Sequence, residues 1–182
     1  MGILKSLVNL GSRNEMNVSL MSNEYQVRQL SEEDVPAIYQ LCSANHLYYE
    51  YCPPFITEKG IKEDMVALPP HTTMQDKYFI GFYDANKLIA VLDLISGYPK
   101  PSIAFIGFFM TDTSVQGKGI GCKIIAYLCD YLKAQNYQTV QLAWVKGNPQ
   151  AEHFWLKNGF VKLKETSSTA ADCVILAERV LK

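Results

Sequence analysis

The chain has 182 residues, of which 48% are hydrophobic, and carries a formal net charge of -1 at pH 7. This length suits one compact domain with a sizeable core. The near-neutral charge argues against nucleic-acid binding, which usually shows as a clearly basic face. No uninterrupted apolar run reaches the ~18 residues that a membrane span needs. We therefore expect neither a nucleic-acid nor a membrane partner.

The five cysteines are odd in number, and no two of them are spaced as C-x-x-C. Metal sites and disulfide frameworks are usually recognised by the spacing of their cysteines in the sequence. We therefore expect reduced thiols, no metal site and a cytoplasmic protein.

The regular patterns begin after residue 22. Residues 1–22 are predicted to be an N-terminal extension, partly mobile, and residues 23–182 a single domain. Strands are predicted where apolar residues alternate or run together, and helices where they recur every three or four positions. The predicted elements are, in chain order, a strand at 25–30, helices at 32–45 and 57–67, strands at 78–84, 88–97 and 103–110, a helix at 119–134, a strand at 136–145, a helix at 148–158, and strands at 160–166 and 173–181.

The stretch "HLYYEYCPPF" between the first two helices has four tyrosines and phenylalanines and two prolines, and it is predicted to be a loop. Three consecutive strands joined by short turns predict antiparallel pairing in the middle of the sheet. The order of elements therefore predicts an α/β fold, with helices packed on one mixed, mostly antiparallel central sheet.

Three glycines, Gly117, Gly119 and Gly121, stand where the strand at 103–110 leads into the helix at 119–134. The first amides of a helix lack internal partners and carry the positive end of its dipole. Glycines there let a ligand approach the backbone closely. The helix start has Lys118 and Lys123 where a stable helix would favour acidic residues. This combination predicts a phosphate-binding turn.

Two common phosphate motifs do not fit this turn. The P-loop requires G-x-x-x-x-G-K-[ST], but Lys118 is followed by Gly119, and Asp112 stands where the first glycine belongs. The dinucleotide fingerprint requires a third glycine where the chain has Cys122, and no acidic residue ends the next strand.

A third motif fits. The residues Gln116, Gly119 and Gly121 match Q/R-x-x-G-x-G/A, and "NPQAEHFWLKNGF" from Asn148 to Phe160 matches a second segment, N-x-x-A-x-x-F-Y-x-x-x-G-F. On these two segments the chain resembles the GCN5-related N-acetyltransferase (GNAT) family, over about residues 24–182. The resemblance implies the GNAT-like fold, in which the central strands splay apart with helices on both faces.

The resemblance also implies acetyl-coenzyme A (acetyl-CoA) as the cofactor and a primary amine of a small molecule or peptide as the acceptor, with direct attack in a ternary complex. The resemblance does not fix the oligomeric state, and a homodimer is one alternative. The residues it assigns to the cofactor are Phe109, Met110, Thr111, Gln116, Gly117, Lys118, Gly119, Ile120, Gly121, Cys122, Asn148, Phe154 and Trp155. Core packing for Phe154 and helix capping for Asn148 are alternative roles.

The chain departs from the family at Trp155, where family members often have a tyrosine that protonates the leaving thiolate. An indole N–H donates a hydrogen bond but delivers no proton at ordinary pH. We therefore expect no single side chain to be an obligatory general acid. The departure also keeps a second hypothesis open, a coenzyme A-binding sensor or regulatory module with little catalysis.

A base is needed as well, because an alkylamine with a pKa of about 10.4 is neutral in only about one molecule in 2,500 at pH 7. Asp93 is the candidate, since it interrupts the apolar strand "LIAVLDLI", where a carboxylate is costly unless solvated or paired. A solvent-facing or backbone-binding role is the alternative. Tyr48, Tyr49 and Glu50 lie where the family's variable loop covers the acceptor, and they suit an amine with apolar surface; loop packing is their alternative role.

Overall fold

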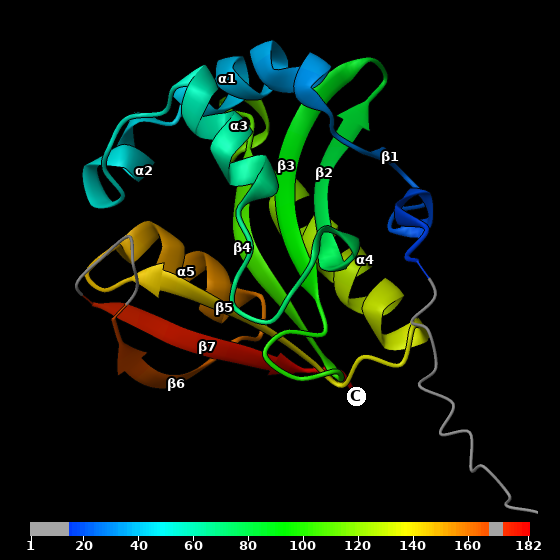
Figure 1. Ribbon diagram of the computed structural model, residues 1–182. Helices are drawn as coiled ribbons and strands as arrows, with labels where there is room; N and C mark the ends of the chain where they lie inside the picture. The colour runs from blue at the N-terminus through cyan, green and yellow to red at the C-terminus, as the bar shows by residue number, and fades with distance from the viewer. Residues whose placement is uncertain (1–14, 168–172) are drawn as a thin grey trace, which may run out of the picture.

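A computed structural model describes residues 15–167 and 173–182 of the chain (Figure 1). It has one seven-stranded sheet in the order β1-β2-β3-β4-β5-β7-β6. The strands are β1 (Gln26–Gln29), β2 (Lys77–Asp84), β3 (Lys87–Ser96), β4 (Ile103–Thr111), β5 (Thr139–Val145), β6 (Val161–Thr166) and β7 (Val174–Val180). The helices are α1 (Val35–Ser43), α2 (His46–Tyr51), α3 (Glu58–Val66), α4 (Ile120–Ala134) and α5 (Pro149–Lys157), with short 3-10 turns η1 (Val18–Leu20), η2 (Glu32–Asp34), η3 (Met74–Asp76) and η4 (Thr113–Val115).

The strand pairing confirms the predicted mixed sheet. All neighbouring strands are antiparallel except β4 and β5, which are parallel. The β4–β5 register extends only from Ile103 to Ile106 on one strand and from Thr139 to Leu142 on the other. Beyond it the two strands diverge, so that the sheet forms a V whose arms are β1–β4 and β5–β7 (Figure 1). The predicted splay of the central strands is confirmed.

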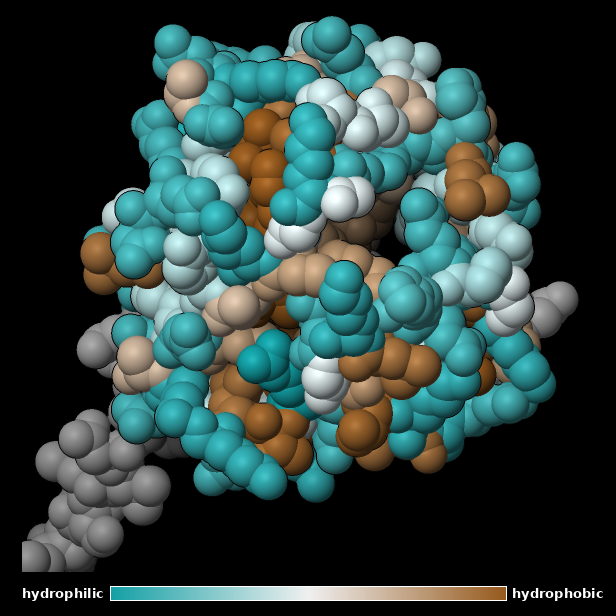
Figure 2. Space-filling model, turned by 180° about the vertical axis from the view of Figure 1, so that it is seen from behind, coloured by the Kyte–Doolittle hydropathy of each residue, from teal (hydrophilic) through white to brown (hydrophobic). Residues whose placement is uncertain are grey.

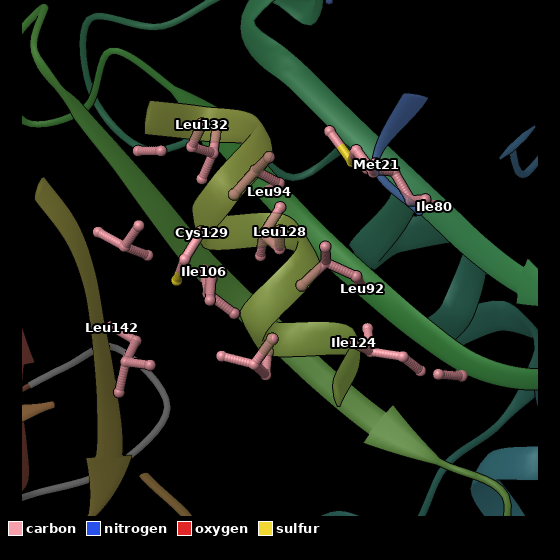
Figure 3. Close-up of a cluster of buried hydrophobic side chains, with 14 of the residues drawn as sticks. Met21, Ile80, Leu92, Leu94, Ile106, Ile124, Leu128, Cys129, Leu132 and Leu142 are labelled. Carbon is pink, nitrogen blue, oxygen red and sulfur yellow. The ribbon is translucent and has the colours of Figure 1, made fainter. Parts of the chain in front are cut away.

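The larger hydrophobic core lies between the sheet and α4. The apolar residues of α4 recur at helical spacing, so Ile124, Leu128 and Leu132 point to the same side and are fully buried. They face strand residues that include Leu92 and Ile106 (Figure 3). This packing fixes α4 across the strands that diverge at the V.

A second core covers the opposite face under α1, α2 and α3. Ile38 from α1 and Ile61 from α3 are each 1% exposed and pack with Val91 of β3. Helices on both faces of the sheet are therefore confirmed. None of the helices among the described residues is long and apolar enough to cross a membrane.

The loop prediction for residues 46–55 is wrong in its first part, where α2 forms from His46 to Tyr51. Tyr49 is 9% exposed and packs into the second core, which stabilises a helix that the aromatic composition disfavours. The helix ends at Cys52, directly before Pro53 and Pro54.

The N-terminal extension was predicted to span residues 1–22, and residues 1–14 lie outside the described residues. Within the described part, Met16, Val18 and Met21 are buried and belong to the larger core. The amide of Met16 donates a hydrogen bond to the hydroxyl of Tyr78, 3.1 Å away. The segment from Met16 to Met21 thus packs as part of the folded body.

The α4 core generates a stability prediction. We expect Leu128→Ala to lower the free energy of unfolding by roughly 2–5 kcal/mol, because it leaves a cavity between α4 and the sheet. Leu156→Ala is the matched control, since Leu156 is also helical but 42% exposed, and it should cost less than about 1 kcal/mol. Denaturant unfolding measures both values, and equal losses would contradict the assignment of the core.

Candidate active site

Beyond Ile106 and Leu142, where β4 and β5 no longer pair, a row of aromatic rings lies between β4 and α5, and we call this region the opening. Phe109 on β4 lies 5.8 Å from Phe154 and 6.0 Å from Trp155, both on α5, measured between ring centroids. Trp155 packs in turn against Phe160, 5.2 Å away. Each ring prefers an offset or edge contact, and this row has such contacts throughout. The aromatic row holds α5 against β4 where the two strands no longer pair.

The glycine turn follows β4 directly and ends at α4. Gly117 and Gly119 have φ angles of +72° and +79°, a left-handed conformation that favours glycine, and Gly119 is the N-cap of α4. A Cβ atom built at either residue would meet nothing within 4 Å. The turn therefore presents bare backbone to open space.

The amides of this turn are unpartnered in the part of the chain that the structure describes. None of those from Gly117 to Cys122 donates a well-formed hydrogen bond to another residue within 15–167 or 173–182. They lie at the N-terminus of a 15-residue helix, where the helix dipole favours negative charge. The geometry suits a phosphate group held by backbone N–H donors.

Gly121 has a different role from the other two glycines. A Cβ atom built there would lie 3.2 Å from Cε2 of Phe154 and 3.5 Å from Cγ2 of Thr111. A side chain at this position would push against the aromatic row. Gly121 thus allows the close packing of α4, α5 and the end of β4.

The side chain of Gln116 ties the turn to its surroundings. Its Nε2 donates to Oδ1 of Asn45 at 2.6 Å and to the carbonyl of Thr111 at 3.1 Å. Asn45 follows α1 and donates through Nδ2 to the carbonyls of Leu41 and Thr111. Asn45 was missed by the sequence analysis, because its partners are distant in sequence and no motif includes it.

The two lysines near the turn differ in their contacts. Lys123 pairs with Glu24, its Nζ lying 3.0 Å from Oε1, so its charge is already offset by the segment before β1. Lys118 is exposed and forms no ion pair with the described residues. Of the two, Lys118 is the cation available to an anion at the turn.

Two predicted cofactor residues have clear structural roles. Asn148 is 3% exposed and caps α5, its Oδ1 accepting from the amide of Ala151 at 3.0 Å. Trp155 is 7% exposed and belongs to the larger core. The capping role considered for Asn148 is therefore present, while Phe154 remains partly buried at the opening.

Asp93 lies in β3 beside an irregularity of the sheet. The β3–β4 register shifts between Asp93, opposite Phe108, and Leu94, opposite Ile106, so that Gly107 has no counterpart. Oδ2 of Asp93 lies 2.8 Å from the position that a Cβ of Gly107 would occupy. The carboxylate thus lies against β4 at Gly107, one residue beyond Ile106, where the pairing of β4 with β5 ends.

The carboxylate of Asp93 is paired with Lys77 of β2. Both Asp93 oxygens lie 2.9 Å from Lys77 Nζ, and the two side chains are 14% and 1% exposed. Burial raises the pKa of Asp93, and the positive charge of Lys77 opposes this rise. The negative charge of Asp64 on α3 adds to the rise.

The three predicted acceptor residues do not lie together. The Tyr48 ring meets the edge of Phe108 at 5.7 Å and so lies near Asp93, whose pairing partner in the register is Phe108. Burial raises the pKa of Tyr48 well above its usual range, which keeps its hydroxyl protonated. Tyr49 is buried in the second core, and Glu50 is exposed. Of the three, Tyr48 is the residue whose ring contacts the strand that borders the opening.

Asp112, which follows β4 directly, has a structural role. Its Oδ1 accepts from the amide of Ser114 at 2.8 Å and from Lys87 Nζ at 3.0 Å, which fixes the turn after β4.

No group of three or more potential metal ligands occurs in the part of the chain that the structure describes. The surface seen from behind has a hollow beside its centre with weakly polar to hydrophobic walls (Figure 2).

Comparisons with known proteins identify the architecture. A model of the acetyltransferase (GNAT) family matches residues 36–160. An acetyltransferase from Thermus thermophilus superposes with a TM-score of 0.67 at 17% identity, over 86% of this chain and 97% of that chain. No curated protein sequence is similar enough to match.

Two further structures have acceptors in their names. Ribosomal-protein-S5-alanine acetyltransferase from Vibrio fischeri has a TM-score of 0.64 at 22% identity and covers 88% of this chain and 95% of its own. Spermidine N-acetyltransferase from Vibrio cholerae, in complex with CoA and spermine, has a TM-score of 0.64 at 20% identity and covers 88% and 97%. These likenesses show a shared fold.

The open turn generates a binding prediction. We expect Gly119→Val to weaken coenzyme A binding by about tenfold or more, because a side chain there separates the amides from a phosphate. Gly147→Val is the matched control, since Gly147 has a φ of +87° and equally open surroundings in the β5–α5 connection. Isothermal titration calorimetry measures both affinities, and unchanged binding by the Gly119 variant would contradict the assignment of the turn.

Proposed function

Because the chain belongs to the acetyltransferase (GNAT) family, whose members take the acetyl group from acetyl-CoA, we propose that it acetylates a primary amine of a small molecule or peptide. The amine attacks directly while both reactants are bound. One observation carries the proposal: the unpartnered amides from Gly117 to Cys122 at the N-terminus of α4, beside the opening between β4 and β5.

The residues at the opening fit acetyl-CoA. The turn amides bind the diphosphate, helped by Lys118, and the unpaired edge of β4 at Phe109 and Met110 binds the pantetheine arm as an added strand would. Phe154 lines the opening next to that edge. When bound, acetyl-CoA supplies a thioester carbonyl carbon, to which the amine nitrogen bonds as the carbon–sulfur bond breaks and the sulfur leaves with the bonding electron pair.

Asp93 is the proposed base. Its carboxylate takes one proton from the attacking nitrogen, directly or through a water, so that a neutral amide results. Its position beside Gly107 supports this role, because that part of β4 borders the opening. The burial that raises its pKa also supports it, since a base works best when its pKa approaches the working pH.

The leaving thiolate takes its proton from water, and no single residue of the protein is required as the acid. Trp155 occupies the position of the family's tyrosine and is buried among Phe109, Phe154 and Phe160. Its indole cannot act as an acid at neutral pH.

On the acceptor side, Tyr48 and Phe108 offer aromatic faces near Asp93, which suit the carbon skeleton of an amine. Glu50 and Asp64 on the same side add negative charge that attracts a protonated amine. Similar structures come from enzymes named for spermidine and for a ribosomal-protein alanine, which supports both small-molecule and peptide acceptors.

The buried Trp155 also favours a second function, an acyl-CoA-binding sensor or regulatory module with little catalysis. A thiol-release assay on a panel of amines separates the two functions. Release of coenzyme A thiol that depends on one amine supports the enzyme. Binding of acetyl-CoA without release on any amine supports the sensor.

We expect Asp93→Asn to lower kcat at pH 7 by roughly 10²–10⁴-fold, because the amine then loses its proton acceptor. Activity should recover in part at higher pH, where more of the amine is already neutral. The control is Asp84→Asn, an exposed aspartate at the end of β2. An unchanged pH profile in the Asp93 variant would reduce Asp93 to a structural residue.

A further inference from the structure

The Lys77–Asp93 pair is an unusual feature for the middle of a sheet. Lys77 is 5% exposed as a residue, and its Nζ lies at equal distances of 2.9 Å from both Asp93 oxygens. Burying two charges costs about as much as their attraction returns, so such a pair contributes little net stability. Its presence calls for a role other than holding β2 to β3, because these strands already pair from Lys77 to Asp84.

The second feature is the glycine at position 107, which has no side chain where β4 faces Asp93. Gly107 lies in β4, and the three atoms nearest to a Cβ built there all belong to Asp93, at 2.8, 3.4 and 3.8 Å. Any larger residue would displace the carboxylate from β4. The glycine thus provides the space that the Asp93 side chain uses at the register shift.

We propose that Lys77 and Gly107 are positioning residues for Asp93. Lys77 holds both carboxylate oxygens and keeps them charged, and Gly107 lets that carboxylate lie against β4 where the strand leaves β5. The inference rests on the proposed function, in which Asp93 accepts the proton of the attacking amine. Neither residue belongs to the motifs that identify the family in this chain.

The charged groups around Asp93 are few. Lys77 faces it from β2, and Asp64 on α3 acts on both residues of the pair. The titratable residue of α1 in the second core is Cys42, whose pKa burial raises to about 12. On α2 the titratable residues of this core are Tyr48 and Tyr49, both kept neutral by burial, and β4 contains no titratable residue. Lys77 is therefore the one cation among these groups.

The positive charge of Lys77 favours the ionised form of Asp93, which is the form that accepts a proton. Asp93 must be ionised to accept the proton as the carbon–nitrogen bond forms, and it then returns that proton to water. A cation at hydrogen-bond distance favours the ionised form, and its removal favours the protonated form. Without Lys77, Asp93 is ionised only at higher pH, so the acidic limb of the kcat/KM profile moves to higher pH.

The first test replaces Lys77 in the full-length protein. We expect Lys77→Met to lower kcat/KM on the acidic limb by roughly tenfold or more, since an opposite charge this close is worth at least about one pH unit. Lys77→Arg should restore most of the loss. Lys62→Met is the control, because Lys62 forms an exposed pair with Glu32 on the same side of the sheet.

A titration without any ligand gives a readout that does not depend on activity. The 13Cγ signal of Asp93, assigned by its loss in Asp93→Asn, should titrate at higher pH in Lys77→Met than in the wild type and stay in place in Lys62→Met. Equal titration and equal pH profiles for wild type and Lys77→Met would overturn the role of Lys77.

The second test uses Gly107→Ala and also decides the matter if Lys77→Met does not fold. We expect this variant to lower kcat about tenfold or more in the wild type, because the new methyl group moves the carboxylate. In an Asp93→Ala background it should change the residual kcat little, since no carboxylate remains to be displaced. An equal loss in both backgrounds would overturn the proposal for Gly107.

The outcomes for the two proposals are distinct. A wild-type protein that releases no thiol with any amine removes the proposed function and this inference together. An active wild type whose Lys77 and Gly107 variants behave like their controls removes only the positioning roles.

Discussion

The early end of the β4–β5 pairing is the constraint on which the rest of the site depends. Two parallel strands hydrogen-bond over Ile103–Ile106 and Thr139–Leu142, and then separate. The separation is stable because other contacts replace the lost ladder: the aromatic rings of Phe109, Phe154 and Trp155 fill one side, and β4 keeps its pairing with β3 up to Thr111. An unpaired strand edge, normally a liability, becomes available to a ligand.

Two separate cores keep this opening in place. The core under α4 joins strands from both arms of the V, with Leu92 and Ile106 on one arm and Leu142 on the other (Figure 3). Among the described residues, the core under α1 and α3 packs on the arm that carries β3 and β4. One arm is thus covered by helices on both faces. That arm carries the proposed base, Asp93, and Phe108 of the proposed acceptor side.

Much of this architecture could be predicted from the sequence, because it depends on local patterns. Short stretches of sequence are enough to predict three of its features. These are the run of three strands that ends with β4, the amphipathic helix α4 and the glycine turn before it. The helix α2 could not be predicted, because burial of Tyr49 under α1 and α3 overrides the composition of its segment. The role of Asp93 as a base stays a prediction, and its pairing with Lys77 could not be predicted because the two residues lie on different strands.

The contacts that complete the site join residues far apart in the chain. Lys77 and Asp93 are 16 positions apart, Asn45 and Gln116 are 71 apart, and Glu24 and Lys123 are 99 apart. No short-range period encodes such pairs. The positive charge at Lys123, interpreted from sequence as free for an anion, is therefore already matched by Glu24, and the same local view could not assign a partner to Asp93.

The hydrogen bonds around the carbonyl of Thr111 have a mechanical consequence. Asn45, between α1 and α2, and Gln116, at the start of the glycine turn, both donate to that one oxygen, and Gln116 also donates to Asn45. A tilt of α1 must therefore carry the turn with it or break these bonds. The helical layer over the proposed acceptor side and the turn proposed to bind the diphosphate are therefore linked parts of a single frame.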